Sequence, residues 1–199
     1  MFKTILFLFL ISLFFEINAQ NSAWKIHVID SSYSGADGVR LADVNNDKRL
    51  DITTGWEEGG YTKVYIHPGY EFVKDLWPSV IAGKTPSVED AVFADIDGNG
   101  IMDIVSSTEG ENKKLYINWS PENPLDFLDS SKWETEILPS SDGIMQWMFA
   151  IPAQIDGSNG VDIIAGSKNL EAKIGWFESP ENRGIFQIGN GIQLDLVPG

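Results

Sequence analysis

Cysteine is absent from this chain of 199 residues. Disulfide bonds therefore cannot stabilise it. Its stability has to come from core packing or from bound metal. Positive charge is also scarce, because 14 Lys and Arg residues stand against 29 Asp and Glu residues and leave a formal net charge of −15. A surface this acidic repels nucleic acid and anionic membranes. Its natural partners are cations.

Helical periodicity is missing as well. No stretch repeats apolar residues every 3.6 positions, so we expect little helix. The one long apolar run, residues 5–15, is too short to cross the ~30 Å hydrocarbon core of a membrane as a helix. Lys3 precedes this run and Ala19 follows it, which is typical of a signal peptide. We therefore predict a cleaved signal over residues 1–19 and a secreted protein, extracellular, periplasmic or at the cell surface; an uncleaved anchor is the alternative.

What the chain does contain is a threefold internal repeat. Asp-rich loops begin at Asp43, Asp95 and Gln154, at spacings of 52 and 59 residues. Each loop follows one β-type segment and precedes two more, and a short Trp-led apolar segment opens each copy, beginning at Trp24, Trp77 and Trp133. Four short strands in about 50 residues, separated by Gly, Pro, Asn and Asp, are the signature of propeller blades. We predict an all-β fold, a β-propeller with about three four-stranded blades at about 24–75, 76–131 and 132–183.

The best-preserved loop is Asp95–Asp103. It has oxygen-bearing side chains at positions 1, 3, 5 and 9 and glycine at positions 4 and 6. This arrangement suits a hard cation with ~6–8 oxygen ligands, which indicates Ca²⁺. An EF-hand is excluded because it needs Glu at position 12, where these loops have Thr54, Ser106 and Ala165. Ordinary Asx-rich turns, which form without metal, are the alternative.

The loop pattern Asp-x-Asn-x-Asp-x-x-x-Asp, in register with its flanking strands, resembles the FG-GAP/VCBS repeats of integrin α-chain propellers and of secreted bacterial proteins. The resemblance covers Trp24 to about Arg183, and the absence of Phe-Gly and Gly-Ala-Pro elements favours the secreted bacterial type. It implies that side chains 1, 3, 5 and 9 and the carbonyl of position 7 hold a structural Ca²⁺. The implied ligands are Asp43, Asn45, Asp47, Arg49 and Asp51 in the first loop, and Asp95, Asp97, Asn99, Ile101 and Asp103 in the second.

The third loop offers fewer ligands. At positions 1 and 5, where the other loops have Asp or Asn, it has Gln154 and Ser158, while Asp156 and Asp162 remain. We therefore expect its metal site to be weak or empty.

Ligands of propellers usually bind near the central funnel, and the segment before each loop-bearing strand tends to lie there. Carboxylates beside tryptophans in this region could form a sugar site, with rings that stack on the sugar and carboxylates that act as acid and base. Surface acids and packed tryptophans are the alternative. The candidate substrate-binding residues are Trp56, Glu57, Glu58, Glu89, Asp90 and Trp147.

Three functions are consistent with these features. The first is a module that binds a glycan or an extracellular protein. The second is the N-terminal part of a polysaccharide lyase or a sugar dehydratase, because propellers similar to this family include such enzymes. The third is a structural spacer in an adhesin.

Propellers close with ~4–8 blades, and about three occur here. Residues 184–199 contain no Trp-led strand, so we interpret them as an incomplete next repeat or a non-native tail. We expect the chain to be part of a larger propeller, such as a seven-bladed one, whose remaining blades are its partners. A dimer of two three-bladed copies is the alternative.

Overall fold

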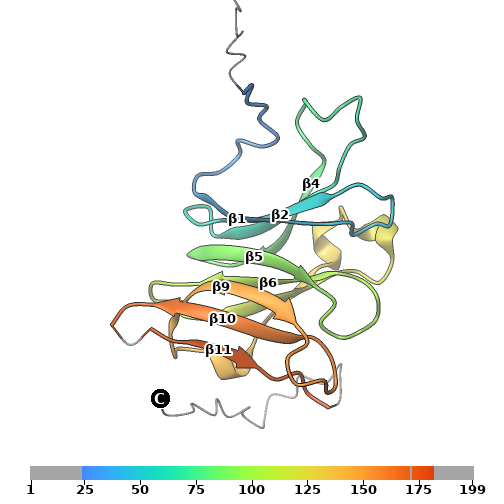
Figure 1. The fold of residues 1–199 in the computed structure, drawn as a ribbon. Helices are drawn as coiled ribbons and strands as arrows, with labels where there is room; N and C mark the ends of the chain where they lie inside the picture. Colours follow the sequence, from blue (N-terminus) through green and yellow to red (C-terminus); the bar gives the residue numbers. More distant parts are fainter. Residues whose placement is uncertain (1–23, 171, 182–199) are drawn as a thin grey trace, which may run out of the picture.

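The computed structural model describes residues 24–170 and 172–181. The predicted signal over 1–19 and the C-terminal segment 184–199 lie outside these residues. The described chain forms three antiparallel sheets that follow one another in space (Figure 1). Its helices are three short 3₁₀ turns at Pro124–Asp126, Ser130–Lys132 and Pro139–Ser141, and no helix of the described part is long and apolar enough to cross a membrane. The predicted all-β class is confirmed.

Each sheet joins strands in chain order. The longest connections within the sheets are residues 66–78 and 120–133, and the second of these contains two of the 3₁₀ turns. The first sheet contains β1 (Ala36–Ala42), β2 (Asp51–Trp56), β3 (Tyr61–Tyr65) and β4 (Ser79–Lys84). The second contains β5 (Val88–Ala94), β6 (Asp103–Thr108), β7 (Leu115–Trp119) and β8 (Glu134–Ile137). The third contains β9 (Gln146–Ala153), β10 (Asp162–Lys168) and β11 (Ile174–Phe177). Two sheets are thus four-stranded blades, and the third has three described strands.

The sequence copies are offset from the sheets by one strand. The segment that follows Trp77 forms β4 and pairs with β3 of the preceding sheet, and the segment that follows Trp133 forms β8 and pairs with β7. The corresponding segment after Trp24 forms no strand, and Trp24 is fully exposed. A repeat shows the period of a chain but not the point at which one sheet ends, which hydrogen bonding decides.

The core lies between successive sheets, in two clusters. Ile104 of β6 belongs to the cluster shared with the first sheet, and its neighbour Val105 belongs to the cluster shared with the third sheet. Because successive side chains of a strand point to opposite faces, the second sheet is covered on both sides. The inner strands β1, β5 and β9 lie side by side (Figure 1), as the first strands of neighbouring blades do.

Residues 29–35 lie against the first sheet, and Asp30 anchors them there. Its carboxylate accepts hydrogen bonds from Lys63 Nζ at 2.5 Å and from the Tyr65 hydroxyl at 2.9 Å. Burial by itself favours the neutral acid, but the hydrogen bonds from Lys63, Ser32 and Tyr65 lower the pKa of Asp30 below its usual value.

Candidate functional site

All three Asp-rich loops are held by the aspartate at position 9. One of its oxygens accepts the backbone N–H of loop position 2, and the other accepts a backbone N–H just beyond the third strand of the same sheet. The pairs are Val44 and His67 on Asp51 (3.0 and 2.8 Å), Ile96 and Ser120 on Asp103 (3.3 and 2.9 Å), and Ile155 and Ser179 on Asp162 (2.8 and 2.8 Å). We call this arrangement the position-9 clamp. It ties each loop to its own sheet.

The clamp carboxylates are almost completely buried. Burial raises the pKa of Asp103 to about 6, and it also raises the pKa of Asp51. Sequence analysis assigned these residues to the metal alone, whereas the structure gives both of their oxygens backbone donors. These aspartates therefore fix the turn through backbone hydrogen bonds, and any contact with an ion would be additional.

The second loop has an oxygen without a partner. Asp95 Oδ2 accepts the N–H of Gly100 at 3.1 Å, but Asp95 Oδ1 is buried and has no hydrogen-bond partner in the described part of the chain. Asp97 and Asn99 each accept a backbone N–H two residues ahead, at 3.0 and 2.7 Å. Gly98 and Gly100 have φ of 75° and 87°, a conformation that favours glycine. A buried carboxylate oxygen without a donor is costly, so this loop fits a hard cation.

The first loop contains a positive charge of its own. Arg49 Nη2 lies 2.5 Å from Asp47 Oδ2, and both Asp43 oxygens accept backbone N–H groups, from Asp47 at 3.0 Å and from Lys48 at 2.8 Å. Lys48, at position 6, has φ of 66°, the left-handed conformation that glycine adopts there in the second loop. An ion in this loop has to compete with the Arg49 guanidinium for Asp47.

The third loop is bonded differently at the positions that the resemblance assigns to the metal. The side-chain amide of Gln154 donates to the carbonyl of Gly160 at 2.5 Å, and Gly160 stands at position 7, whose carbonyl the resemblance assigns to the metal. Asp156 accepts the N–H of Ser158 at 2.8 Å, and Asp162 is engaged in the clamp. The predicted weakness of this site stays a prediction, and these hydrogen bonds are consistent with it.

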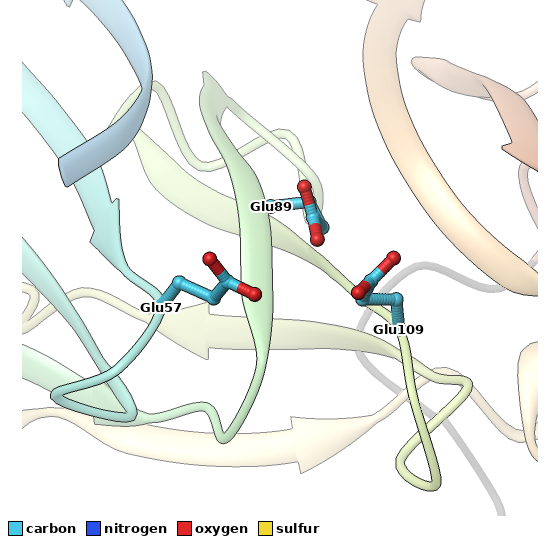
Figure 2. Close-up of side chains that lie close together, drawn as sticks. All are labelled: Glu57, Glu89 and Glu109. Carbon is cyan, nitrogen blue, oxygen red and sulfur yellow. The ribbon is translucent and has the colours of Figure 1, made fainter. Parts of the chain in front are cut away.

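At the opposite end of the strands, three glutamates meet (Figure 2). Glu57 follows β2, Glu89 lies at a bulge near the start of β5, and Glu109 follows β6. One carboxylate oxygen of each lies within 4.8 Å of the others. Lys168 at the end of β10 contacts Glu109 and lies 4.0 Å from Glu89. We call these four residues the funnel cluster.

The funnel cluster is assembled by the repeat. Glu57, Glu109 and Lys168 each stand six residues after a position-9 aspartate. Glu57 and Glu89 are among the ligand-binding residues predicted from sequence, but Lys168 is not. Its position in the repeat, which matches that of Glu57 and Glu109, is the feature that could have identified it. Burial and the neighbouring charges of Glu89 and Glu58 raise the pKa of Glu57. Burial also raises the pKa of Glu89, although Lys168 opposes that shift. Two of the acids therefore hold their protons more tightly than usual.

The other predicted ligand residues are not gathered in this cluster. Trp56 is buried and donates to the Tyr65 hydroxyl at 2.7 Å, and Trp147 is buried, donates to the Ser141 carbonyl at 3.1 Å and packs on Phe177. Their rings are covered and do not offer a stacking face. Asp90 is completely buried and paired with Arg40 at 2.9 Å, while Glu58 is exposed.

Comparison with known families agrees with this architecture. The blades and their loops define a partial, propeller-type all-β module. Within it, residues 43–106 match the FG-GAP-like repeat, a segment that begins at the first Asp-rich loop and ends in β6. The match supports the FG-GAP family for this part of the chain. No curated protein matches the chain.

Proposed function

We propose that this protein is a secreted, calcium-binding propeller module that binds a glycan or an extracellular protein. The observation that carries the calcium proposal is the buried, unpartnered Asp95 Oδ1. Bound Ca²⁺ would supply positive charge to a loop that contains three aspartates, and it would fix the turn between β5 and β6. The role of the ion is structural, because the protein itself supplies most of the ligands.

Two loops would hold the ion. The second is the stronger candidate, and the first has the Arg49 guanidinium as a competitor. The proposed ligands are Asp95, Asp97, Asn99, the Ile101 carbonyl and Asp103 in the second loop, and Asp43, Asn45, Asp47, the Arg49 carbonyl and Asp51 in the first.

Calcium titration by calorimetry, together with thermal melting in Ca²⁺ and in a chelator, tests the proposal. We expect Ca²⁺ to raise the melting temperature of the wild type and Asp95→Asn to abolish most of that increase. Glu71→Gln is the matched control, because it removes one negative charge at an exposed site outside the loops. Absence of calcium binding would overturn the proposal, and an equal loss in both variants would reduce it to a general charge effect.

The funnel cluster is the surface at which we expect the ligand to bind. Its carboxylates accept hydrogen bonds and the Lys168 ammonium donates them, which suits the hydroxyl groups of a glycan or the polar groups of a protein. Glycan-array binding of the wild type and of Glu57→Gln tests this site. We expect the variant to bind more weakly, whereas equal binding would show that the ligand binds elsewhere.

The convergence of Glu57, Glu89 and Glu109 also favours a second candidate function, catalysis on a polysaccharide. Acids with raised pKa beside an ammonium group suit proton transfer, as a lyase or dehydratase requires. Incubation with uronic-acid polysaccharides tests this activity, because a lyase product has new ultraviolet absorbance. Loss of the signal in Glu89→Gln would support catalysis, and glycan binding without any turnover would favour the binding module.

We further propose that another blade of the same repeat covers the third sheet. A Cβ built on Gly55 of the first sheet would meet Val88 of the next sheet, whereas a Cβ on Gly166, the equivalent residue of β10, would meet no atom of the described residues within 4 Å. Phe149, Ile151 and Ile174 are more than half exposed beside it. A monomer of the secreted chain that melts cooperatively by itself would contradict this proposal.

A further inference from the structure

The third loop differs from the others in the residue at its first position and in how that residue is bonded. Gln154 Nε2 donates to the carbonyl of Ser158 at 2.6 Å and to the carbonyl of Gly160 at 2.5 Å. Gln154 Oε1 accepts the N–H of Gly157 at 2.7 Å. One side chain therefore bonds to three backbone groups of its own loop, two carbonyls and one N–H.

The orientation of this amide follows from its partners. A backbone carbonyl can only accept and a backbone N–H can only donate. The nitrogen must therefore face Ser158 and Gly160, and the oxygen must face Gly157. The reversed amide would set oxygen against two carbonyls and lose all three hydrogen bonds.

We infer that the side-chain amide of Gln154 takes the place of the metal ion, so that the third loop is closed without calcium. The inference rests on the proposed calcium function of the other loops, because it explains why the repeat includes one loop that needs no ion. The Gly160 carbonyl, at position 7, receives an N–H where the other loops would offer their carbonyl to Ca²⁺.

The remaining polar groups of the third loop are consistent with closure by a neutral donor. The loop has two carboxylates, against three in the second loop. Asp162 accepts two backbone N–H groups and Asp156 accepts one. A cation in the third loop would meet donors where it needs acceptors.

The consequence is a difference in calcium dependence between neighbouring blades. The turn between β9 and β10 keeps its shape whether or not Ca²⁺ is bound, while the turn between β5 and β6 has an oxygen that only an added partner satisfies. At low calcium, the third blade therefore remains formed at its loop and the second blade loosens at its loop.

Hydrogen exchange of the full chain, measured residue by residue in chelator and in Ca²⁺, tests the inference. In the wild type we expect the Gly157 N–H to be equally protected in both conditions and the Gly100 N–H to gain protection in Ca²⁺. Gln154→Glu keeps the oxygen and removes the donors, so we expect about tenfold faster exchange at Gly157 in chelator. Calcium dependence of Gly157 protection in the wild type would overturn the inference.

A second variant gives a reading that does not depend on exchange rates. Gln154→Asp restores the residue of the other loops, and we expect it to bind one more Ca²⁺ per chain than the wild type in calorimetry. Unchanged stoichiometry together with unchanged Gly157 protection would overturn the inference. If the wild type binds no Ca²⁺ at all, the proposed function fails, but the measurements in chelator still show whether Gln154 closes the loop.

Discussion

The second and third loops have the same length and the same place in their blades, but their first side chains are bonded differently. Both contain nine residues, both turn from an inner strand into the next strand of a blade, and both end in the position-9 clamp. The second begins with Asp95, which has a buried oxygen without a donor, and the third begins with Gln154, whose amide bonds to its own backbone. Under the proposed function, an ion satisfies the polar groups of the second loop and a side-chain amide satisfies those of the third.

The first loop lies between these extremes. It retains all the oxygen ligands of the pattern, yet the Arg49 side chain already neutralises one of them. If the proposed ion binds, we therefore expect ion dependence to vary from blade to blade. We expect the clamp, which all three loops share, to be the part of the loop that the fold needs most.

The largest expected effect comes from removing the clamp. Asp103→Ala and Asp162→Ala each leave two buried backbone N–H groups without an acceptor, which should lower the free energy of unfolding by about 3 kcal/mol. Chemical denaturation in chelator measures the loss. Asp75→Ala, at an exposed aspartate outside the loops, is the control and should change stability little. If Asp162→Ala were neutral while Asp103→Ala was not, the clamp would not be a shared element.

The next effect separates the two loops by their response to calcium. At a Ca²⁺ concentration about 100 times its dissociation constant, a site that binds only the folded state adds about 2.7 kcal/mol of stability. We expect Asp95→Ala to lose this calcium-dependent part and Gln154→Ala to retain it. Gln154→Ala should instead lose about 1 kcal/mol equally with and without Ca²⁺. The same calcium response in both variants would remove the distinction between the loops.

A smaller expected effect is the loss of stability at low pH that comes from Asp30, which lies outside the loops. Because the pKa of Asp30 is lowered in the folded state, the folded protein binds this proton less readily than the unfolded chain does. The stabilisation is therefore present above the unfolded pKa of about 4 and is lost as the pH falls below it. Asp30→Asn should reduce stability by about 1 kcal/mol at pH 7 and flatten this acid loss, independently of Ca²⁺. Denaturation curves from pH 7 to pH 2 check the prediction.

The smallest expected effect concerns the first loop. Arg49→Ala removes the guanidinium beside Asp47 and frees a carboxylate oxygen for the ion, so we expect calcium affinity there to rise about two- to fivefold. Calorimetry on an Asp95→Asn background isolates this loop. Arg49→Lys is the control, because it keeps the charge and should change affinity less. A fall in affinity on Arg49→Ala would show that the guanidinium supports the site.

Much of the fold could be predicted from sequence because the repeat is a local property. The alternation of short apolar strands with Asp-rich loops recurs at similar spacings, and it identified the strands before and after each loop. The same periodicity could not show that the strands after Trp77 and Trp133 complete the preceding sheet. Pairing between strands depends on hydrogen bonds between distant residues, which a one-dimensional period does not contain.

By itself, the sequence determined the all-β blades and the positions of the three loops, and it predicted that the third loop binds metal weakly or not at all. Only the tertiary structure decided that Glu57, Glu89, Glu109 and Lys168 meet, because they come from three different sheets. Only the structure gave the position-9 aspartates their backbone donors and the Gln154 amide its orientation. Residue type limits the bonds that a side chain can form, but the folded backbone decides which partners lie within reach.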